Sequence, residues 1–328
     1  MQRVFEVALQ KAKDLLADKS VDRVLGWKRG EFFYDETPAV FHTAEELSDF
    51  VYDGFSGANL SKYLVGETQK DGKVLAMLKP CDTYSFNELV KEHRVDRSKV
   101  YILGVECGGT LDFYKIKDLG IDGILGMEEK DGELTFHTLY GDKSCKRNDV
   151  LLERCRSCKN HRKHVAYDEL ITSGKETGLP EEDPFAPVRE LEAKTPDERY
   201  AFWQSQLSRC IRCNACRNVC PACSCRTCVF DNPKSGVATK SNADDFEDQM
   251  YHIIRAFHVA GRCTDCGECT RVCSERIPLY LLHRKVIKDL DTYYGNYEAG
   301  ADTDSRAPLV FYTPDDADPS VVSDQGGK

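Results

Sequence analysis

The sequence predicts an α/β domain followed by a mainly α-helical domain built around cysteine-rich loops. Apolar runs typical of buried strands occur in the first half, at residues 21–27, 73–78 and 100–105. Eleven of the 16 cysteines fall between Cys210 and Cys273, and none falls in the first 80 residues. Helical patterns lead into and out of these cysteine-rich stretches. A chain of 328 residues is long enough for two such domains.

The α/β domain is expected at residues 1–160. Residues 1–20 have the pattern of an amphipathic helix, and the three apolar runs predict strands. Residues 81–98, between the last two runs, predict a helix. A strand, a helix and a strand with short joints indicate a parallel crossover unit. A β-hairpin is expected at Lys130–Asp131–Gly132, because Asp-Gly is a strong turn signal.

The helical domain is expected at residues 195–296, after a polar linker at 161–194 that is rich in Glu, Pro and Gly. Its first helix is predicted to begin at Thr195, where Pro196 and Glu198 complete a capping box with proline at the first helical position. A second helix is expected near 243–260 and a third from Pro278. The apolar face of the second helix would consist of Phe246, Met250, Ile253, Ile254 and Phe257. Residues 297–328 are expected to form a solvated acidic tail, with a docking role for LVFY at 309–312 as the alternative.

Composition excludes several classes of protein. The net charge of −10 argues against a nucleic-acid partner. No run of about 18 apolar residues predicts a membrane span, and the first 20 residues lack the apolar core and cleavage site of a signal peptide. We therefore expect a cytoplasmic protein, in which clustered cysteines bind metal more often than they form disulfides.

Two cysteine runs in the second half have the spacing of ferredoxin-type cluster loops, C-x2-C-x2-C-x3-C. In two-cluster ferredoxins the fourth cysteine of each run ligates the other cluster. The predicted ligands are therefore Cys210, Cys213, Cys216 and Cys273 for cluster one, and Cys263, Cys266, Cys269 and Cys220 for cluster two. A pair of zinc sites is the alternative, but zinc needs four ligands per site and does not need this whole run twice.

The surroundings of the two runs differ. Pro221 follows the first run but Ser274 follows the second, so the second loop is expected to differ slightly from the first. Forty-two residues lie between Cys220 and Cys263 and contain a predicted helix. This pattern resembles the helical two-cluster modules found in iron–sulfur subunits of fumarate reductases and of heterodisulfide reductases.

Further cysteines lie in the α/β half. Cys81 (in KPCD) and Cys107 (in GVEC) each follow a predicted strand, and Cys155 and Cys158 form CRSC. If the strands are parallel neighbours, Cys81 and Cys107 emerge at the same edge of the sheet, where α/β proteins place their sites. A zinc site completed by His161 and His164 is the alternative for the CRSC pair.

These motifs resemble the beta subunits of deazaflavin-coenzyme-reducing hydrogenases and their relatives. The likeness covers roughly residues 60–170, and the cysteine runs resemble a subgroup in which this domain is fused to a dicluster module. The resemblance implies that a third 4Fe–4S cluster is bound by Cys81, Cys107, Cys155 and Cys158. It also implies FAD in some members, with Lys79 and Asp82 as candidate lining residues. Otherwise Asp82 is a helix-capping acid and Lys79 a surface cation.

The remaining cysteines and the basic residues near the runs leave more than one interpretation open. A fourth metal site, of zinc or iron–sulfur, would use Cys145, Cys223, Cys225 and Cys228. Alternatively these thiols pack as small apolar groups. The basic residues would tune cluster potentials, face an acidic partner, or form a solvated surface; they are Arg209, Arg212, Arg217, Arg262 and Arg271.

We therefore expect an iron–sulfur electron-transfer subunit of an anaerobic oxidoreductase complex, which passes single electrons between its clusters. The resemblance implies a formate dehydrogenase, a hydrogenase or a heterodisulfide-reductase-like flavoprotein as the partner. The alternative is a catalytic reductase whose α/β domain binds flavin, exchanges a hydride with a deazaflavin or nicotinamide coenzyme, and feeds its own clusters. No G-x-G-x-x-G fingerprint is present, and neither catalytic residues nor flavin contacts are assigned from the sequence.

Overall fold

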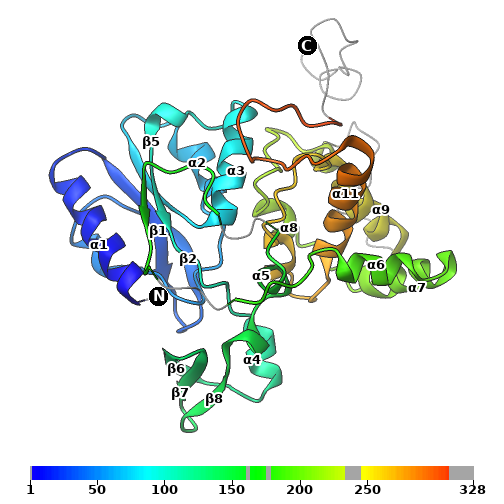
Figure 1. Cartoon of the computed structure of the whole chain (residues 1–328), viewed down its shortest axis with the longest axis horizontal. Helices are drawn as coiled ribbons and strands as arrows, with labels where there is room; N and C mark the ends of the chain where they lie inside the picture. Colours follow the sequence, from blue (N-terminus) through cyan, green and yellow to red (C-terminus); the bar gives the residue numbers. More distant parts are fainter. Residues whose placement is uncertain (1, 160–162, 175–178, 233–244, 310–328) are drawn as a thin grey trace, which may run out of the picture.

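A computed structural model describes residues 2–159, 163–174, 179–232 and 245–309. Within these ranges the chain forms an α/β half, a small antiparallel sheet below it, and a helical half beside it (Figure 1). This agrees with the predicted fold class. None of the described helices is long and apolar enough to cross a membrane.

The α/β half is built on a six-stranded sheet in the order β2-β1-β4-β5-β9, with β3 pairing with β1. The three predicted strands are present as β1, β4 and β5, and β4 pairs with both β1 and β5 in parallel. Antiparallel β2 and β3 pair with β1. The strands are β1 (Arg23–Arg29), β2 (Glu36–Phe41), β3 (Phe50–Val51), β4 (Val74–Leu78), β5 (Val100–Val105) and β9 (Glu169–Ile171).

Helices cover both faces of this sheet. Figure 1 shows α1 on one side and α3 on the other, between the sheet and the helical half. α1 buries Val4, Ala8 and Ala12 in the core, at the spacing that the amphipathic pattern predicts. The helices of this half are α1 (Gln2–Ala17), α2 (Ser61–Glu67) and α3 (Pro80–Lys91), and α4 (Phe113–Asp118) and α5 (Glu153–Arg156) follow.

A second sheet, in the order β6-β7-β8, projects from the α/β half (Figure 1). Its first turn is the predicted hairpin. Asp131 and Gly132 both have positive φ, 53° and 81°, as a type I′ turn requires. Phe136 and Leu134 anchor the sheet in a separate apolar core. The strands are β6 (Ile124–Lys130), β7 (Glu133–Thr138) and β8 (Lys143–Lys146).

The helical half begins where predicted. Thr195 caps α7, its side chain accepts a hydrogen bond from the Glu198 amide, and the capping box is complete. The helices are α6 (Ala186–Glu192), α7 (Pro196–Leu207), α8 (Ala215–Asn218), α9 (Asp245–His258), α10 (Glu268–Arg271) and α11 (Leu279–Tyr294). Short 3-10 turns lie at Glu46–Asp49, Arg97–Lys99, Arg147–Val150 and Val229–Asp231.

Three segments differ from the sequence prediction. The expected linker contributes β9 to the edge of the main sheet, where Leu103 pairs with Glu169, and it also contains α6. On α9 the expected apolar face is only partly buried: Ile254 packs against an apolar cluster of the helical half, whereas Phe246 and Phe257 are about 70% exposed. In the described part of the expected tail, Ala299 and Ala307 are buried. Residues 310–328, with most of LVFY, lie outside the described ranges, as do 243 and 244 of the second predicted helix.

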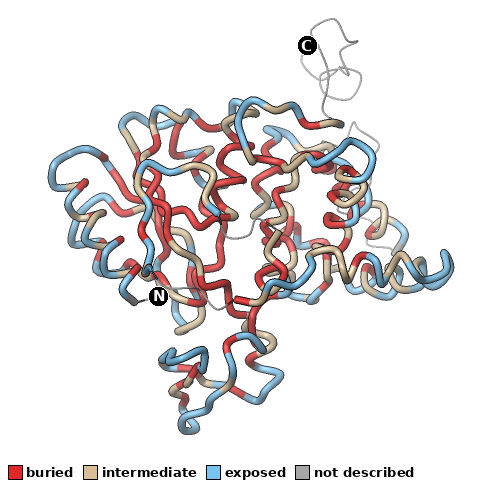
Figure 2. The backbone as a smooth tube through the Cα atoms, viewed as in Figure 1, coloured by how far each residue is buried: buried red, intermediate tan, exposed pale blue. Residues whose placement is uncertain are grey.

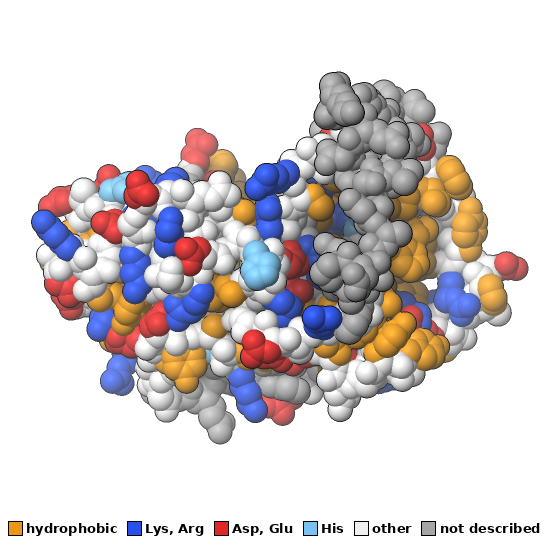
Figure 3. All heavy atoms as spheres, turned by 90° about the horizontal axis from the view of Figure 1, so that it is seen from above, with side chains coloured by type: hydrophobic (Ala, Val, Ile, Leu, Met, Phe, Trp, Pro, Cys, Tyr) orange, Lys and Arg blue, Asp and Glu red, His pale blue; other side chains and the backbone are white. Residues whose placement is uncertain are grey.

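The two halves share a buried seam, visible in Figure 2 as buried chain running from the sheet through α3 into the helical half. On α3, Ser85 Oγ lies 2.8 Å from Thr264 Oγ1, inside the second cysteine run. The Asn87 side-chain amide donates to the Gly300 carbonyl, at 3.0 Å. Away from the seam, the face in Figure 3 mixes acidic and basic side chains over the α/β half and gathers apolar ones at the opposite end.

Candidate iron–sulfur sites

The two ferredoxin-type runs have the same backbone geometry. In the first, Arg212 and Asn214 have left-handed φ of 53° and 61°; in the second, Asp265 and Gly267, at the equivalent positions, have 53° and 67°. Each loop then enters a one-turn helix, α8 or α10. Asn and Gly accept this conformation more readily than most residues. The loops therefore repeat one fold up to their third cysteine, and the Pro221/Ser274 difference falls after it.

The first run and the last cysteine of the second line one cavity. Its thiols come from Cys210, Cys213, Cys216 and Cys273. The exposed side chain is Cys213, whereas Cys216 is buried. This first cavity therefore lies close to the protein surface on the side of Cys213.

A second cavity holds the other set of thiols predicted from the runs. Cys263, Cys266 and Cys269 come from the second run, and Cys220 crosses over from the first. Cys266 and Cys269 are both buried, so this second cavity is deeper than the first. The crossed arrangement is the one expected from two-cluster ferredoxins.

A third cavity lies at the carboxyl ends of β4 and β5. Cys81 stands in the first turn of α3, directly after β4, and Cys107 follows β5. Cys155 and Cys158 come from α5 and the residues after it, and all four thiols line this cavity. The parallel pairing of β4 with β5 explains why residues 26 positions apart meet here.

Buried charges border the third cavity. Lys79 is 2% exposed, lies 3.0 Å from Asp82 Oδ2, and donates to the Ala58 carbonyl at 2.8 Å. Its ammonium group also lies 4.2 Å from the centre of the Trp27 ring. Asp82 accepts from the Lys79 amide and so caps α3, as one interpretation expected. Lys79 is not the surface cation of that interpretation, because Trp27 and Asp82 enclose it.

Several backbone amides point at thiol sulfurs. The amide of Gly109 donates to Cys107 Sγ at 3.3 Å, that of Thr110 to Cys155 Sγ at 3.3 Å, and that of Arg212 to Cys210 Sγ at 3.4 Å. Such bonds stabilise thiolates, and they are one of the factors that set the potential of an iron–sulfur cluster.

His252 lies beside the first cavity. Its Nε2 is 3.2 Å from Cys210 Sγ. Burial, together with the charges of Arg255 and Arg212, holds the pKa of His252 at about 3. The imidazole is therefore neutral, and a neutral imidazole has one N–H that can be donated to a thiolate.

The described residues offer no site for a single small ion such as zinc. Zinc–sulfur bonds of about 2.3 Å in a tetrahedron hold four sulfurs close together. No group of three or more His, Cys, Asp or Glu side chains in the described ranges could hold a single metal ion. A four-iron cluster carries its ligands around a larger body. Of the histidines in the zinc alternative, His161 lies outside the described ranges, and His164 Nε2 is 3.1 Å from the Leu78 carbonyl.

The four remaining cysteines are not brought together. Cys145 lies in β8 and packs against the apolar core of the small sheet. Cys223, Cys225 and Cys228 lie in the helical half, just after the first run. Cys223 forms a side-chain hydrogen bond with Cys220, and this bond lowers the pKa of the Cys220 thiol.

Of the five arginines predicted near the clusters, Arg212 is buried and Arg271 is partly buried. Arg212 lies 3.3 Å from Asp248 Oδ1 and over the Tyr251 ring. Arg271 donates to both Glu268 oxygens. The other three make separate pairs: Arg217 with Asp231, Arg262 with Glu92, and Arg209 with Gln206.

The sequence prediction missed several buried arginines, among them Arg154, Arg255 and Arg284. Arg154 directly precedes a predicted ligand, and this proximity was the one signal available. Arg255 and Arg284 lie on helices whose sequence does not distinguish a buried cation from a solvated one.

Comparison with known proteins agrees with this geometry. Residues 206–277 match the family described as a 4Fe-4S dicluster domain. The chain is 27% identical to the F420-dependent formate dehydrogenase subunit beta of Methanocaldococcus jannaschii, over 90% of this chain and 92% of that one. It is also 27% identical to the F420-dependent formate dehydrogenase 1 subunit beta of Methanococcus maripaludis, over 90% and 91%.

Among solved structures, the F420-reducing NiFe hydrogenase complex of Methanosarcina barkeri contains a similar chain. It has a TM-score of 0.39 and 15% identity, and the match covers 49% of this chain and 59% of that one. The resemblance inferred from the cysteine motifs is confirmed by the two sequence relatives. The helical half contains an iron–sulfur domain of the dicluster type.

Proposed function

We propose that this chain is the electron-transfer subunit of an oxidoreductase complex and that it carries three 4Fe–4S clusters. The observation that supports this most directly is the set of three cavities, each lined by four thiols. Cluster one would be held by Cys210, Cys213, Cys216 and Cys273; cluster two by Cys263, Cys266, Cys269 and Cys220; and cluster three by Cys81, Cys107, Cys155 and Cys158.

The cavities adjoin, as a chain of single-electron carriers requires. Cys220 and Cys273 cross between the two runs and tie the first and second cavities together. Asp265 lines both the second and the third. Cys213 is exposed beside the first cavity, so cluster one would be the one that exchanges electrons with another subunit.

The partner is inferred from the relatives. Both sequence relatives are named beta subunits of F420-dependent formate dehydrogenases and align over nine-tenths of this chain. The catalytic subunit of a formate dehydrogenase is therefore the first candidate partner, and a hydrogenase or flavoprotein subunit the next.

A flavin-containing reductase is the second candidate function. The relatives are named F420-dependent, and an enzyme of that kind exchanges a hydride with a deazaflavin coenzyme. In this case the α/β half would bind FAD, which would supply the means to take up a hydride, release its proton and pass its two electrons singly to the clusters. A flavin absorbance band and coenzyme oxidation with a viologen acceptor would support this function. A protein with cluster absorbance alone, inert toward deazaflavin and nicotinamide coenzymes, would exclude it.

The cluster content is tested by iron and sulfide analysis of the full chain purified without oxygen, together with electron paramagnetic resonance. Three clusters give about twelve irons per chain, two give about eight and four about sixteen. Cys213→Ser, Cys266→Ser and Cys107→Ser each alter one cavity, and each is expected to lower the iron content. Cys145→Ser is the matched control, because Cys145 packs in β8, and it should leave the iron content unchanged.

Two outcomes would contradict the proposal. A colourless protein without iron would remove the electron-transfer function altogether. Iron content unchanged by Cys107→Ser would contradict the binding of a third cluster by this set of thiols, without affecting the two ferredoxin-type clusters.

A further inference from the structure

Each gap between neighbouring cavities contains a buried arginine that carboxylates compensate poorly. Arg255 is 2% exposed, and no salt bridge joins it to a carboxylate of the described ranges. Arg154 is 8% exposed, and the carboxylate paired with it, that of Glu268, is 3.5 Å away and also bonds to Arg271. Burying a cation is costly unless a negative group compensates it. Two such residues at equivalent places therefore need an explanation.

Arg255 lies between the first and second cavities. One turn before it on α9, His252 lines the first cavity, and four residues after it Val259 lines the second. Its Nη2 donates to the Cys216 carbonyl at 2.8 Å. Burial alone would lower the pKa of Arg255, but the thiols of Cys216, Cys220 and Cys269 raise it well above its ordinary value.

Arg154 lies between the second and third cavities. Its Nη1 is 3.9 Å from Cys81 Sγ, and its Nη2 is 3.5 Å from Glu268 Oε1. Its aliphatic stem passes over Gly267 in the second cysteine loop, so closely that a Cβ on Gly267 would clash with Arg154 Cδ. Gly267 lines the second cavity, so the stem reaches it while the guanidinium group approaches the third.

Both arginines leave the same donor unused. The Nε–H of Arg154 and that of Arg255 are buried and have no hydrogen-bond partner among the described residues. Buried donors without a partner are rare and call for an acceptor at the site. The sulfides and thiolates of a cluster are such acceptors, and they carry the negative charge that offsets the cost of burying a guanidinium group.

We propose that Arg255 and Arg154 are positioning residues in an electron relay formed by the three clusters. Each arginine stabilises an added electron on both clusters that flank it. The order of the relay is then one, two, three, with cluster two in the middle. Each transfer oxidises one cluster by one electron and reduces its neighbour by one. This inference rests on the proposed three-cluster function.

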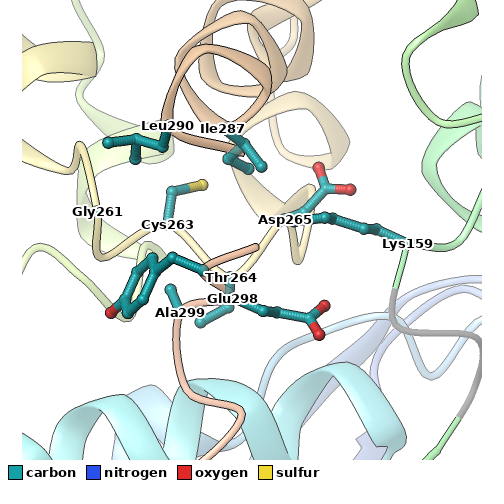
Figure 4. A pocket seen from close by; sticks show the side chains of 10 residues that line it. Lys159, Gly261, Cys263, Thr264, Asp265, Ile287, Leu290, Glu298 and Ala299 are labelled. Carbon is teal, nitrogen blue, oxygen red and sulfur yellow. The ribbon is translucent and has the colours of Figure 1, made fainter. Parts of the chain in front are cut away.

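The surroundings of Asp265 agree with a middle position for the second cavity. Asp265 lines the second and third cavities and also the small pocket of Figure 4. Figure 4 shows the Lys159 side chain extending from the segment after α5 toward the loop that carries Cys263 and Asp265. Residues of the second and third sites thus face the same small pocket, whereas no described residue lines both the first and the third cavity.

The test is a redox titration of the three clusters by electron paramagnetic resonance, in the full chain purified without oxygen. Arg255→Gln removes one positive charge and should lower two of the three midpoint potentials. Arg154→Gln should also lower two. The midpoint potential of cluster two should be lowered by both substitutions. In the double variant it should therefore fall more than the potentials of clusters one and three. This pattern requires no prior assignment of signals to clusters.

Two further variants separate charge from packing. Arg154→Lys and Arg255→Lys keep the charge and should leave the potentials close to those of the unaltered chain. If Arg154→Gln loses its clusters, Glu268→Gln tests the same gap with the opposite sign, because it removes a negative charge and should raise the potentials of clusters two and three.

The outcomes distinguish this inference from the function on which it rests. Iron far below about twelve per chain in the unaltered protein would overturn the three-cluster function itself. With full iron content, the relay order is refuted if both Gln variants lower the same pair. The role of the arginines is refuted if a Gln variant shifts no potential, or if its Lys counterpart shifts the potentials as much.

Discussion

Arg284 on α11 is expected to tie the loops of the second and third sites together. It is 1% exposed, and its Nε lies 3.0 Å from each oxygen of Asp265, in the second cysteine run. The other end of the guanidinium group donates to Ser157, between Cys155 and Cys158, with 2.7 Å to Oγ and 3.0 Å to the carbonyl. It also donates to the Pro184 carbonyl at 3.1 Å. One side chain therefore bonds to both cysteine loops.

Arg284→Gln should be strongly destabilising. It leaves the Asp265 carboxylate buried without its cation, and removing one partner of a buried pair costs about 3–5 kcal/mol. For a domain of this size that corresponds to a fall in the unfolding midpoint on the order of 10 °C. The assay is thermal unfolding followed by circular dichroism at a fixed scan rate without oxygen, together with iron content per chain.

Arg189→Gln is the matched control. Arg189 pairs with Asp183, but their side chains are 52% and 47% exposed, and exposed pairs contribute about 0–1 kcal/mol. The control should therefore shift the midpoint by a few degrees at most and should retain its iron. If both variants lower the unfolding midpoint equally, the buried hydrogen bonds of Arg284 do not contribute the expected stability.

Two further substitutions test other parts of the structure. Burial, with the nearby Asp53 charge, raises the pKa of Glu36 from 4.5 to about 8, although Arg29 and Ser56 act in the opposite direction. Glu36 thus stabilises the fold while protonated, and this contribution is lost as pH rises through about 8. At pH 9 the Glu36→Gln variant should have a higher unfolding midpoint than the unaltered chain, and this difference should disappear toward pH 5. A difference in midpoint that does not change with pH would contradict this. Gly267→Ala combines a positive φ with the clash against Arg154 and should lower both the midpoint and the iron content, whereas Gly66→Ala, which meets nothing within 4 Å, should do neither.

Much of the fold could be predicted because the deciding signals are local. The apolar runs of β1, β4 and β5, the cap at Thr195 and the Asp-Gly turn each depend on a few adjacent residues. The cysteine spacing also predicted which thiols would share each cavity. The third set of thiols was predicted from the family resemblance, together with the expectation that parallel strands end at the same edge of the sheet.

The missed features depend on tertiary contacts. β9 has three residues and no recognisable alternation, so its pairing with β5 is decided by the sheet rather than by its own sequence. On α9 the apolar stripe suggested a core face, but the buried residues include Asp248, His252 and Arg255. A hydrophobic pattern identifies a buried face when the interior is apolar, and this interior is lined by thiols and charges.

The helical half combines a small apolar cluster with buried charges. The α/β half has a large apolar core around Trp27, although it also buries charged residues such as Arg23 and Asp82. The apolar cluster of the helical half is small and includes Cys216 and Cys269, the predicted cluster ligands. Arg154, Arg255 and Arg284 are enclosed around these cysteines. Under the proposed function, the negative charge of the clusters would offset the cost of burying these arginines.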